Sequence, residues 1–199
     1  YSQTKWVAEQ VVLDAMRRGV AARIFRPALL TPSIAGGGYN FDIAIRLLAF
    51  MMNHGLGTTA HNQVSFTPAD LAAGNIVAIS GVADTVGETY HVTRDEYATM
   101  TDITVILGTL AGRTFQPYDL HAFVPEIIRR CHSGDLLFPL LDFLARSVDN
   151  ISAMEFKRYD NSRYRHARAL SAFGKADPPL HDVVLGILRF MRKHGLVTH

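Results

Sequence analysis

The order of the periodic segments constrains the fold of this chain more than any single motif does. In the first 95 residues, short apolar segments of strand length alternate with amphipathic segments of helix length. The strand-like segments are residues 20–25, 63–66 and 88–92, and the helix-like segments are residues 4–18, 41–53 and 67–81. Alternation of this kind predicts a parallel sheet covered by helices. We therefore predict an α/β fold.

The remainder of the chain is predicted to be almost entirely helical. Thr101 is a suitable cap for a helix that ends before Gly112, and a short extended segment follows at residues 114–118. The later helical segments are residues 120–130, 136–146, 162–170 and 180–194. A run of helices after alternating elements indicates a second, helical part of the fold.

Proline and glycine mark three boundaries in the first half. Residues 20–25 are predicted to form a short buried strand that Pro27 ends, because proline cannot continue a ladder. Thr67 and Pro68 are predicted to begin a helix. The three glycines at residues 36–38 are predicted to be a flexible hinge within a long loop.

The composition limits the class of protein and its compartment. The chain has 199 residues, of which 48% are apolar and 19% charged, as is typical of a globular protein with a good core. A net charge of +2 requires no nucleic-acid partner. The single cysteine, Cys131, fits a reducing compartment, and the most apolar run is too short to cross a membrane. We expect a cytoplasmic protein without nucleic-acid or membrane partners, and, since Tyr1 is no initiator methionine, a processed or excised piece.

Tyr1 and Lys5 are the candidate catalytic pair. Side chains four residues apart lie one above the other on a helix, which places the lysine ammonium beside the phenol. A neighbouring positive charge lowers the pKa of a phenol and makes it a better proton donor to a developing alkoxide. On spacing alone, an exposed pair without a catalytic role is the better interpretation. The wider sequence context changes that balance.

Four stretches supply this context. They read YSQTKWVAE at residues 1–9, RIFRP at 23–27, FTPAD at 66–70, and PPL at 178–180 where the closing helix begins. In this order and spacing they resemble an extended short-chain dehydrogenase/reductase. The similarity is closest to the thioester reductase domains of nonribosomal peptide synthetases, polyketide synthases and carboxylic acid reductases. The resemblance implies the C-terminal part of a Rossmann-like fold with a mostly helical substrate-binding lid.

The resemblance also implies a chemistry. An acyl or peptidyl thioester on the phosphopantetheine arm of a carrier protein would be reduced with NADPH and released as an aldehyde or an alcohol. Tyr1 would donate the proton to the oxyanion, and Lys5 would tune Tyr1 and bind the nicotinamide ribose. The cofactor-binding residues would be Tyr1, Lys5, Pro27, Ala28, Leu29 and Leu30.

The same resemblance divides the chain into two parts. Residues 1–95 would be a remnant of the dinucleotide-binding domain, with an inserted substrate-side helix at residues 41–54. Residues 96–199 would be the mostly helical substrate-binding subdomain. Apolar residues such as Leu47, Leu48 and Phe143 either line an acyl channel or form ordinary core, and for most of them we favour the core.

The sequence departs from the family pattern in several ways. Ala28 stands where many relatives have glycine, and proline-alanine-aspartate at residues 68–70 replaces the more usual proline-valine-aspartate, a mild change. The largest departure is that no glycine-rich phosphate turn follows a first strand. The serine or threonine that helps to polarise the carbonyl in the family cannot be assigned. We therefore expect the isolated chain to be inactive and to bind NADPH poorly.

Two alternative functions stay open. One is a nucleotide-sugar epimerase or dehydratase of the same superfamily, although its lid would need more polar groups than this one offers. The other is a non-catalytic carrier-docking or oligomerisation module. Because the strand at residues 20–25 lacks most of its sheet partners in this chain, its edge favours self-association.

Structural roles are predicted for the remaining charged side chains and for the residues of types that can bind metals. Residues 157–168 interleave basic and aromatic side chains. We favour a solvated helix face there, then a docking face for an acidic carrier protein, with nucleic acid a distant third. Cys131 and His132 have no further ligands at suitable spacing, so no metal site is expected. Asp70 is more typical of a stabilised helix N-terminus than of a substrate contact.

Overall fold

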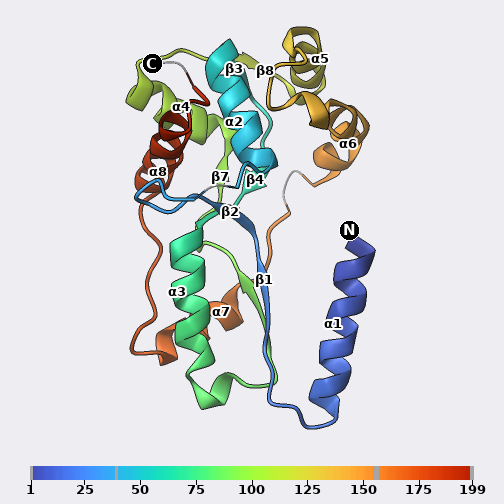
Figure 1. Ribbon diagram of the computed structural model, residues 1–199, viewed down its shortest axis with the longest axis vertical. Helices are drawn as coiled ribbons and strands as arrows, with labels where there is room; N and C mark the ends of the chain where they lie inside the picture. The colour runs from blue at the N-terminus through green and yellow to red at the C-terminus, as the bar shows by residue number, and fades with distance from the viewer. Residues whose placement is uncertain (1, 39, 155–156, 198–199) are drawn as a thin grey trace.

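The computed structural model describes residues 2–38, 40–154 and 157–197. Figure 1 shows an elongated molecule in which one helix stands apart from the body and the others surround short strands. The helices are α1 (Ser2–Arg17), α2 (Ile43–His54), α3 (Ala69–Ser80), α4 (Met100–Ala111), α5 (Leu120–Arg130), α6 (Leu141–Ala153), α7 (Ser162–Leu170) and α8 (Leu180–Lys193). Short 3₁₀ turns lie at Ala83–Thr85 and Phe138–Leu140.

The strands pair across long stretches of sequence. The parallel pairs are β1 (Ile24–Pro27) with β6 (Thr89–Val92), β2 (Leu29–Thr31) with β5 (Phe66–Pro68), and β3 (Leu56–Thr58) with β8 (Gln116–Tyr118). β4 (Gln63–Val64) and β7 (Ala98–Thr99) form an antiparallel pair. Parallel strands joined through helices are the arrangement predicted for a Rossmann-like fold, so the predicted α/β class is confirmed.

The first strand differs from its prediction in position and burial. β1 begins at Ile24 and includes Arg26 and Pro27, which were expected to end it. Pro27 is tolerated because it occupies the last position, and the next amide, that of Ala28, donates to the carbonyl of Val92 at 3.0 Å. The strand is half-buried to exposed rather than buried, because β6 is its only partner strand among the described residues.

Three helix starts also differ from their predictions. Thr67 and Pro68 belong to β5, and α3 begins only after them. Thr99, not Thr101, caps α4 through a capping box with Asp102. The helix expected at residues 136–146 begins at residue 141, after a 3₁₀ turn that contains Pro139. A strand pair replaced the local helix signal before α3, and a proline turn replaced it before α6. The start of α4 is set by another local signal, the capping box of Thr99 and Asp102.

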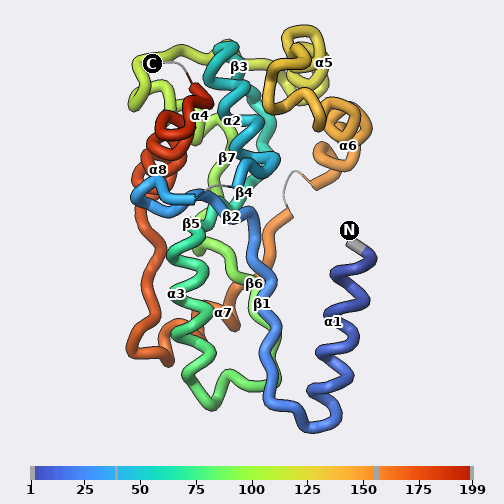
Figure 2. Tube along the Cα trace, viewed as in Figure 1, coloured from blue at the N-terminus to red at the C-terminus, as the bar shows by residue number. Residues whose placement is uncertain are grey.

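Two apolar cores hold the molecule together. The larger core joins α2, α4, α5 and α8 and includes the fully buried Leu48, Met51 and Phe190. The smaller core packs α3 and α7 against β6, with the ring of Phe25 stacked on Tyr90 at 5.4 Å between centroids. Among the described residues, neither core includes a residue of α1, which Figure 2 shows as a separate arm beside β1.

The glycine loop is packed against α8 rather than free to hinge. The Gly36 amide donates to the Ser33 carbonyl at 2.8 Å, and the Gly37 amide donates to the Ser33 hydroxyl at 2.8 Å. A Cβ on Gly36 would lie 2.8 Å from Cβ of Arg189 in α8. Glycine is needed here for close approach between the loop and the helix, so the predicted hinge was wrong.

Candidate functional site

Helix α1 carries Lys5, one member of the candidate catalytic pair. Tyr1 lies outside the described residues, so its role stays a prediction. Lys5 is exposed near the beginning of α1. Glu9 is four residues further along, which places it one turn below Lys5 on the same side of the helix.

A bidentate ion pair fastens α1 to β1. The Arg26 guanidinium binds both carboxylate oxygens of Glu9, and its Nε donates to Oε2 at 2.9 Å. The hydrogen bond from Arg26 lowers the pKa of Glu9, and the same bond raises the pKa of Arg26. Because Lys5 shares the side of Glu9, Lys5 lies on the face of α1 that turns toward β1. Sequence reasoning missed this pair, because Glu9 and Arg26 lie in different elements and no local spacing links them.

The predicted nicotinamide-end residues lie where the first strand changes partner. Pro27 ends β1 opposite Val92, Ala28 forms the break, and Leu29 and Leu30 open β2. This is the carboxyl end of β1, the edge at which open parallel sheets bind ligands. Helix α1, which carries Lys5, is therefore fastened to β1, and residues 27–30 lie at the carboxyl end of the same strand.

Leu29 and Leu30 point to opposite sides of β2, as alternate strand residues do. Leu30 is 38% exposed and lines a pocket of about 360 Å³ together with Gly37 and Gly38 of the glycine loop. Leu29 is half-buried and lines a separate cavity of about 210 Å³.

The cavity beside Leu29 is apolar. Helices α2, α5 and α6 supply most of its wall. Two polar side chains in the wall are already engaged: the Asn62 amide donates to the Ile151 carbonyl at 2.6 Å, and the Thr58 hydroxyl accepts from the Ala60 amide at 3.1 Å. The wall thus presents hydrocarbon to the cavity.

For several apolar residues, the sequence allowed either a place in an acyl channel or a place in the core. In the structure, these residues form two groups. Leu47, Leu48 and Phe143 line the cavity. Phe50 and Met51 are buried at 3% and 0% exposure in the larger core and do not line it. The core interpretation is confirmed for Phe50 and Met51, and also for Leu48, which belongs to the core while it lines the cavity. A channel for an acyl group stays a prediction.

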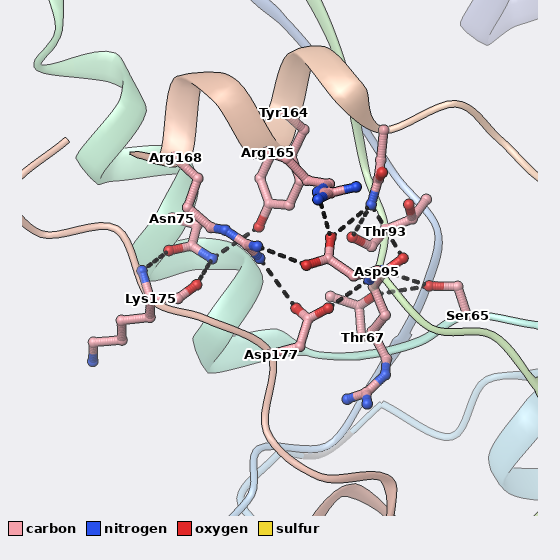
Figure 3. A network of polar contacts seen from close by, with 12 residues as sticks. Ser65, Thr67, Asn75, Thr93, Asp95, Tyr164, Arg165, Arg168, Lys175 and Asp177 are labelled. Carbon is pink, nitrogen blue, oxygen red and sulfur yellow. Dashed lines mark hydrogen bonds and ion pairs between the residues drawn. The ribbon is translucent and has the colours of Figure 1, made fainter. Parts of the chain in front are cut away.

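The basic segment 157–168 makes extensive contacts within the protein (Figure 3). Arg168 donates to Asp95 at 2.9 Å and to Asp177 at 3.3 Å. Tyr164 is 1% exposed, its hydroxyl accepts from the Asn75 amide at 2.9 Å, and burial raises its pKa. The solvated face favoured from sequence is wrong for these two residues, because Tyr164 fastens α7 to α3 and Arg168 fastens it to the segments that hold Asp95 and Asp177. That these carboxylates face Arg168 could not be identified without the structure.

Neither a metal cluster nor a membrane-spanning helix is present in the described parts of the chain. Within residues 2–38, 40–154 and 157–197, no group of three or more His, Cys, Asp and Glu side chains could hold a metal ion. None of the helices in these ranges is both long and apolar enough to cross a bilayer. Burial raises the pKa of the Cys131 thiol to about 11, which makes it a poor nucleophile. Asp70 lies exposed in the first turn of α3.

Comparisons with known proteins agree with this geometry. A family model for an NAD-binding domain, described as "Male sterility protein", matches residues 1–76. The non-canonical nonribosomal peptide synthetase hkm10 of Aspergillus hancockii is 28% identical over 180 residues, which cover 86% of this chain and 17% of that protein. L-2-aminoadipate reductase of Saccharomyces cerevisiae is 35% identical over 81 residues, 40% of this chain and 6% of that protein. The chain thus spans only a small part of these relatives.

Solved structures share the fold. The terminal R domain of the myxalamid PKS-NRPS pathway superposes with a TM-score of 0.80 at 18% identity, covering 100% of this chain and 50% of that one. A thiolation-reductase di-domain of an archaeal nonribosomal peptide synthetase gives 0.72 at 18% identity, covering 96% and 40%. UDP-glucuronic acid 4-epimerase of Bacillus cereus gives 0.61 at 13% identity, covering 94% and 51%.

The chain therefore has a Rossmann-like α/β fold, which it shares with terminal reductase domains. In sequence it is similar to an NAD-binding family model over residues 1–76, to a nonribosomal peptide synthetase and to an aminoadipate reductase.

Proposed function

We propose that this chain is part of an oxidoreductase that releases a carrier-bound acyl or peptidyl thioester by reduction, as an aldehyde or an alcohol. The observation that carries the proposal is the Glu9–Arg26 pair. It holds helix α1, which carries Lys5, beside the strand that leads into residues 27–30. The kinds of relative that match, peptide synthetases and aminoadipate reductases, support the same reaction class.

The residues present suit the nicotinamide end of a cofactor. The break at Ala28 lies at the carboxyl end of β1, and Lys5 faces that strand. NADPH, when bound, would supply the hydride. Tyr1 would give a proton to the oxyanion of the thioester, and Lys5 would keep the phenol acidic. The hemithioacetal then expels the thiol and leaves the aldehyde, and a second round gives the alcohol.

The organisation of the parent protein belongs to the proposal. Residues 1–95 would complete a dinucleotide-binding domain, and residues 96–199 would cover the substrate. A carrier protein would deliver the thioester, and the enzyme would work in the cytoplasm. Since the 199 residues contain no glycine-rich phosphate turn, the isolated chain should be inactive and bind NADPH weakly. Micromolar binding in calorimetry would contradict that expectation.

The decisive experiment replaces the phenol. The chain is expressed with upstream sequence that carries a phosphate turn, and NADPH oxidation on an acyl thioester is followed. Tyr1→Phe should lower turnover by about 10²–10⁴-fold, because positioned proton transfer contributes that much. Tyr159→Phe is the matched control, since Tyr159 is 49% exposed on another segment. Unchanged turnover of Tyr1→Phe would reject the assignment.

The nucleotide-sugar alternative fits the site less well. A sugar diphosphate requires several positioned polar groups, and the polar side chains around the cavity beside Leu29 are bonded within the protein. Incubation with nucleotide sugars and with acyl thioesters separates the two reactions. A carrier-docking module without catalysis would turn over neither.

A further inference from the structure

The cavity beside Leu29 has a position and a lining that select one kind of ligand. It begins at a residue of the predicted nicotinamide end and extends beneath α5 and α6. Phe143, at 55% exposure on α6, stands in its wall and faces solvent, so the cavity is not sealed within the core. A group bonded to a carbonyl at the end of β1 would have two spaces beside it, this cavity at Leu29 and the pocket at Leu30. Asn40 and Asp42 line the pocket at Leu30, whereas the wall of this cavity is apolar.

We propose that this cavity binds the acyl tail of the substrate, and that the tail is an uncharged hydrocarbon group the size of a phenyl ring or a short alkyl chain. This inference rests on the proposed function, which places the reacting carbonyl beside residues 27–30. It adds the chemical class of the acyl group, which neither the family resemblance nor the comparisons specify.

The size of the cavity sets the upper limit on the tail. A cavity of about 150 Å³ lined by Leu, Ile and Phe holds benzene. At about 210 Å³, this cavity accommodates a ring with an additional methylene or two, or a short alkyl chain. It is too small for a long side chain that keeps its bound water.

The lining sets the polarity. The cavity surface is formed by apolar atoms, and Asn62 and Thr58 each already make one hydrogen bond within the protein, to Ile151 and Ala60. A charged or hydroxylated tail would therefore lose its water without gaining a partner. Such an unpaired group is strongly disfavoured. The structure therefore selects by rejection of polar tails as well as by attraction of apolar ones.

Binding to the 199-residue chain tests the inference without turnover. The probes are pantetheine conjugates whose thioester is replaced by a stable amide: acetyl, hexanoyl, phenylacetyl and glutaryl. Hexanoyl and phenylacetyl conjugates should bind at least about tenfold more tightly than the glutaryl conjugate, and affinity should rise about fourfold for each buried methylene until the cavity is filled. Equal affinity for hexanoyl and glutaryl conjugates would overturn the inference.

A matched pair of variants assigns the effect to the cavity. Ala60 lines the cavity in an irregular segment, so Ala60→Phe should fill it and abolish the preference for hexanoyl over acetyl. Ala145 is exposed on α6 and does not line the cavity, so Ala145→Phe should leave the preference intact. Circular dichroism and thermal melting confirm that each variant is folded. A preference that survives Ala60→Phe in a folded variant would contradict the proposal.

Failure of the proposed function gives a different result. If the chain with upstream sequence reduces hexanoyl and glutaryl thioesters equally well, the reductase assignment holds and the acyl pocket is wrong. If hexanoyl conjugates bind selectively but no thioester is reduced, the pocket holds and the reductase assignment is wrong.

Discussion

The pair between Glu9 and Arg26 positions the candidate catalytic helix more than it stabilises the fold. The Arg26 side chain is 46% exposed, and exposed ion pairs contribute about 0–1 kcal/mol. α1 contributes no residue to either apolar core in the described chain. Loss of the pair should therefore appear as motion of α1 and leave the free energy of unfolding nearly unchanged.

Arg26→Met should release α1 from β1. Trp6, the only tryptophan, lies on α1 at 64% exposure, so its fluorescence anisotropy reports on motion of this helix. We expect lower anisotropy in the variant and a nearly unchanged unfolding midpoint. Arg17→Met removes the same charge from α1, where Arg17 contacts only Asp14 of the same helix at 3.9 Å among the ion pairs described, and should have no effect. Equal anisotropy in wild type and Arg26→Met would contradict the positioning role.

Acid should release α1 from β1 in the wild type, as Arg26→Met does. Arg26 holds the pKa of Glu9 below its ordinary value of 4.5. A carboxylate with a lowered folded pKa stabilises above the ordinary pKa, and its contribution is lost as pH falls through the folded value. The anisotropy of Trp6 should therefore decrease below pH 4.5 in the wild type. In Arg26→Met this decrease in anisotropy should be absent. A decrease of the same size in the variant would refute the link between protonation of Glu9 and motion of α1.

At the scale of elements, the loop that leads into the three glycines packs closely against α8. A Cβ on Gly186 of α8 would lie 2.8 Å from the Ser33 carbonyl oxygen and 3.0 Å from that of Ile34. Both obstacles are backbone atoms, which cannot rotate away as a side-chain end can. Glycine in this helix is therefore a packing requirement.

Gly186→Ala and Gly74→Ala should differ in their effect on stability. Alanine gains about 1 kcal/mol over glycine in a helix. At Gly186 the forced displacement of the loop costs about 1–3 kcal/mol, so the net effect is destabilising or neutral at best. A Cβ on Gly74, in α3, would meet nothing within 4 Å beyond its own stretch of helix, so Gly74→Ala should stabilise by about 1 kcal/mol. Urea unfolding measures both, and stabilisation by Gly186→Ala would show that the loop moves freely.

At the scale of the whole molecule, α1 has two different faces. Glu9 contacts β1, whereas Val7 and Val11 lie two residues to either side and so point roughly the opposite way, at 53% and 65% exposure. β1 also has no second partner strand among the described residues. An exposed apolar helix face and an open strand edge both favour association with another chain.

We expect the isolated chain to self-associate through this arm. Light scattering at increasing concentration should show oligomers of the wild type. The double variant Val7→Lys/Val11→Lys should remain monomeric, because burying two lysines is unfavourable. Val77→Lys is the control, since Val77 is 73% exposed on α3 and far from the arm in sequence. A monomer at every concentration, with α1 ordered, would contradict the expectation.

Local signals in the sequence were sufficient for much of the fold. The bounds predicted for α5 and α7 agree with the structure, and those for α8 agree within one residue, because amphipathic periodicity and caps act within a few residues. The motifs at residues 1–9, 23–27, 66–70 and 178–180 together carried the family resemblance. They also indicated the segments that are proposed to form the site.

Contacts between distant residues decided the rest. The shift of β1 onto Arg26 and Pro27, the strand at Thr67–Pro68 and the inward-facing Tyr164 and Arg168 all depend on partners far away in the sequence, such as Val92 and Asn75. The sequence by itself determined the class of fold, since this follows from the order of periodic segments along the chain, and its motifs made Tyr1 and Lys5 the candidate catalytic pair. Only the tertiary structure decided which side chains form the core, which form the apolar cavity, and that Glu9 binds Arg26, because packing and ion pairing depend on distances that local spacing does not specify.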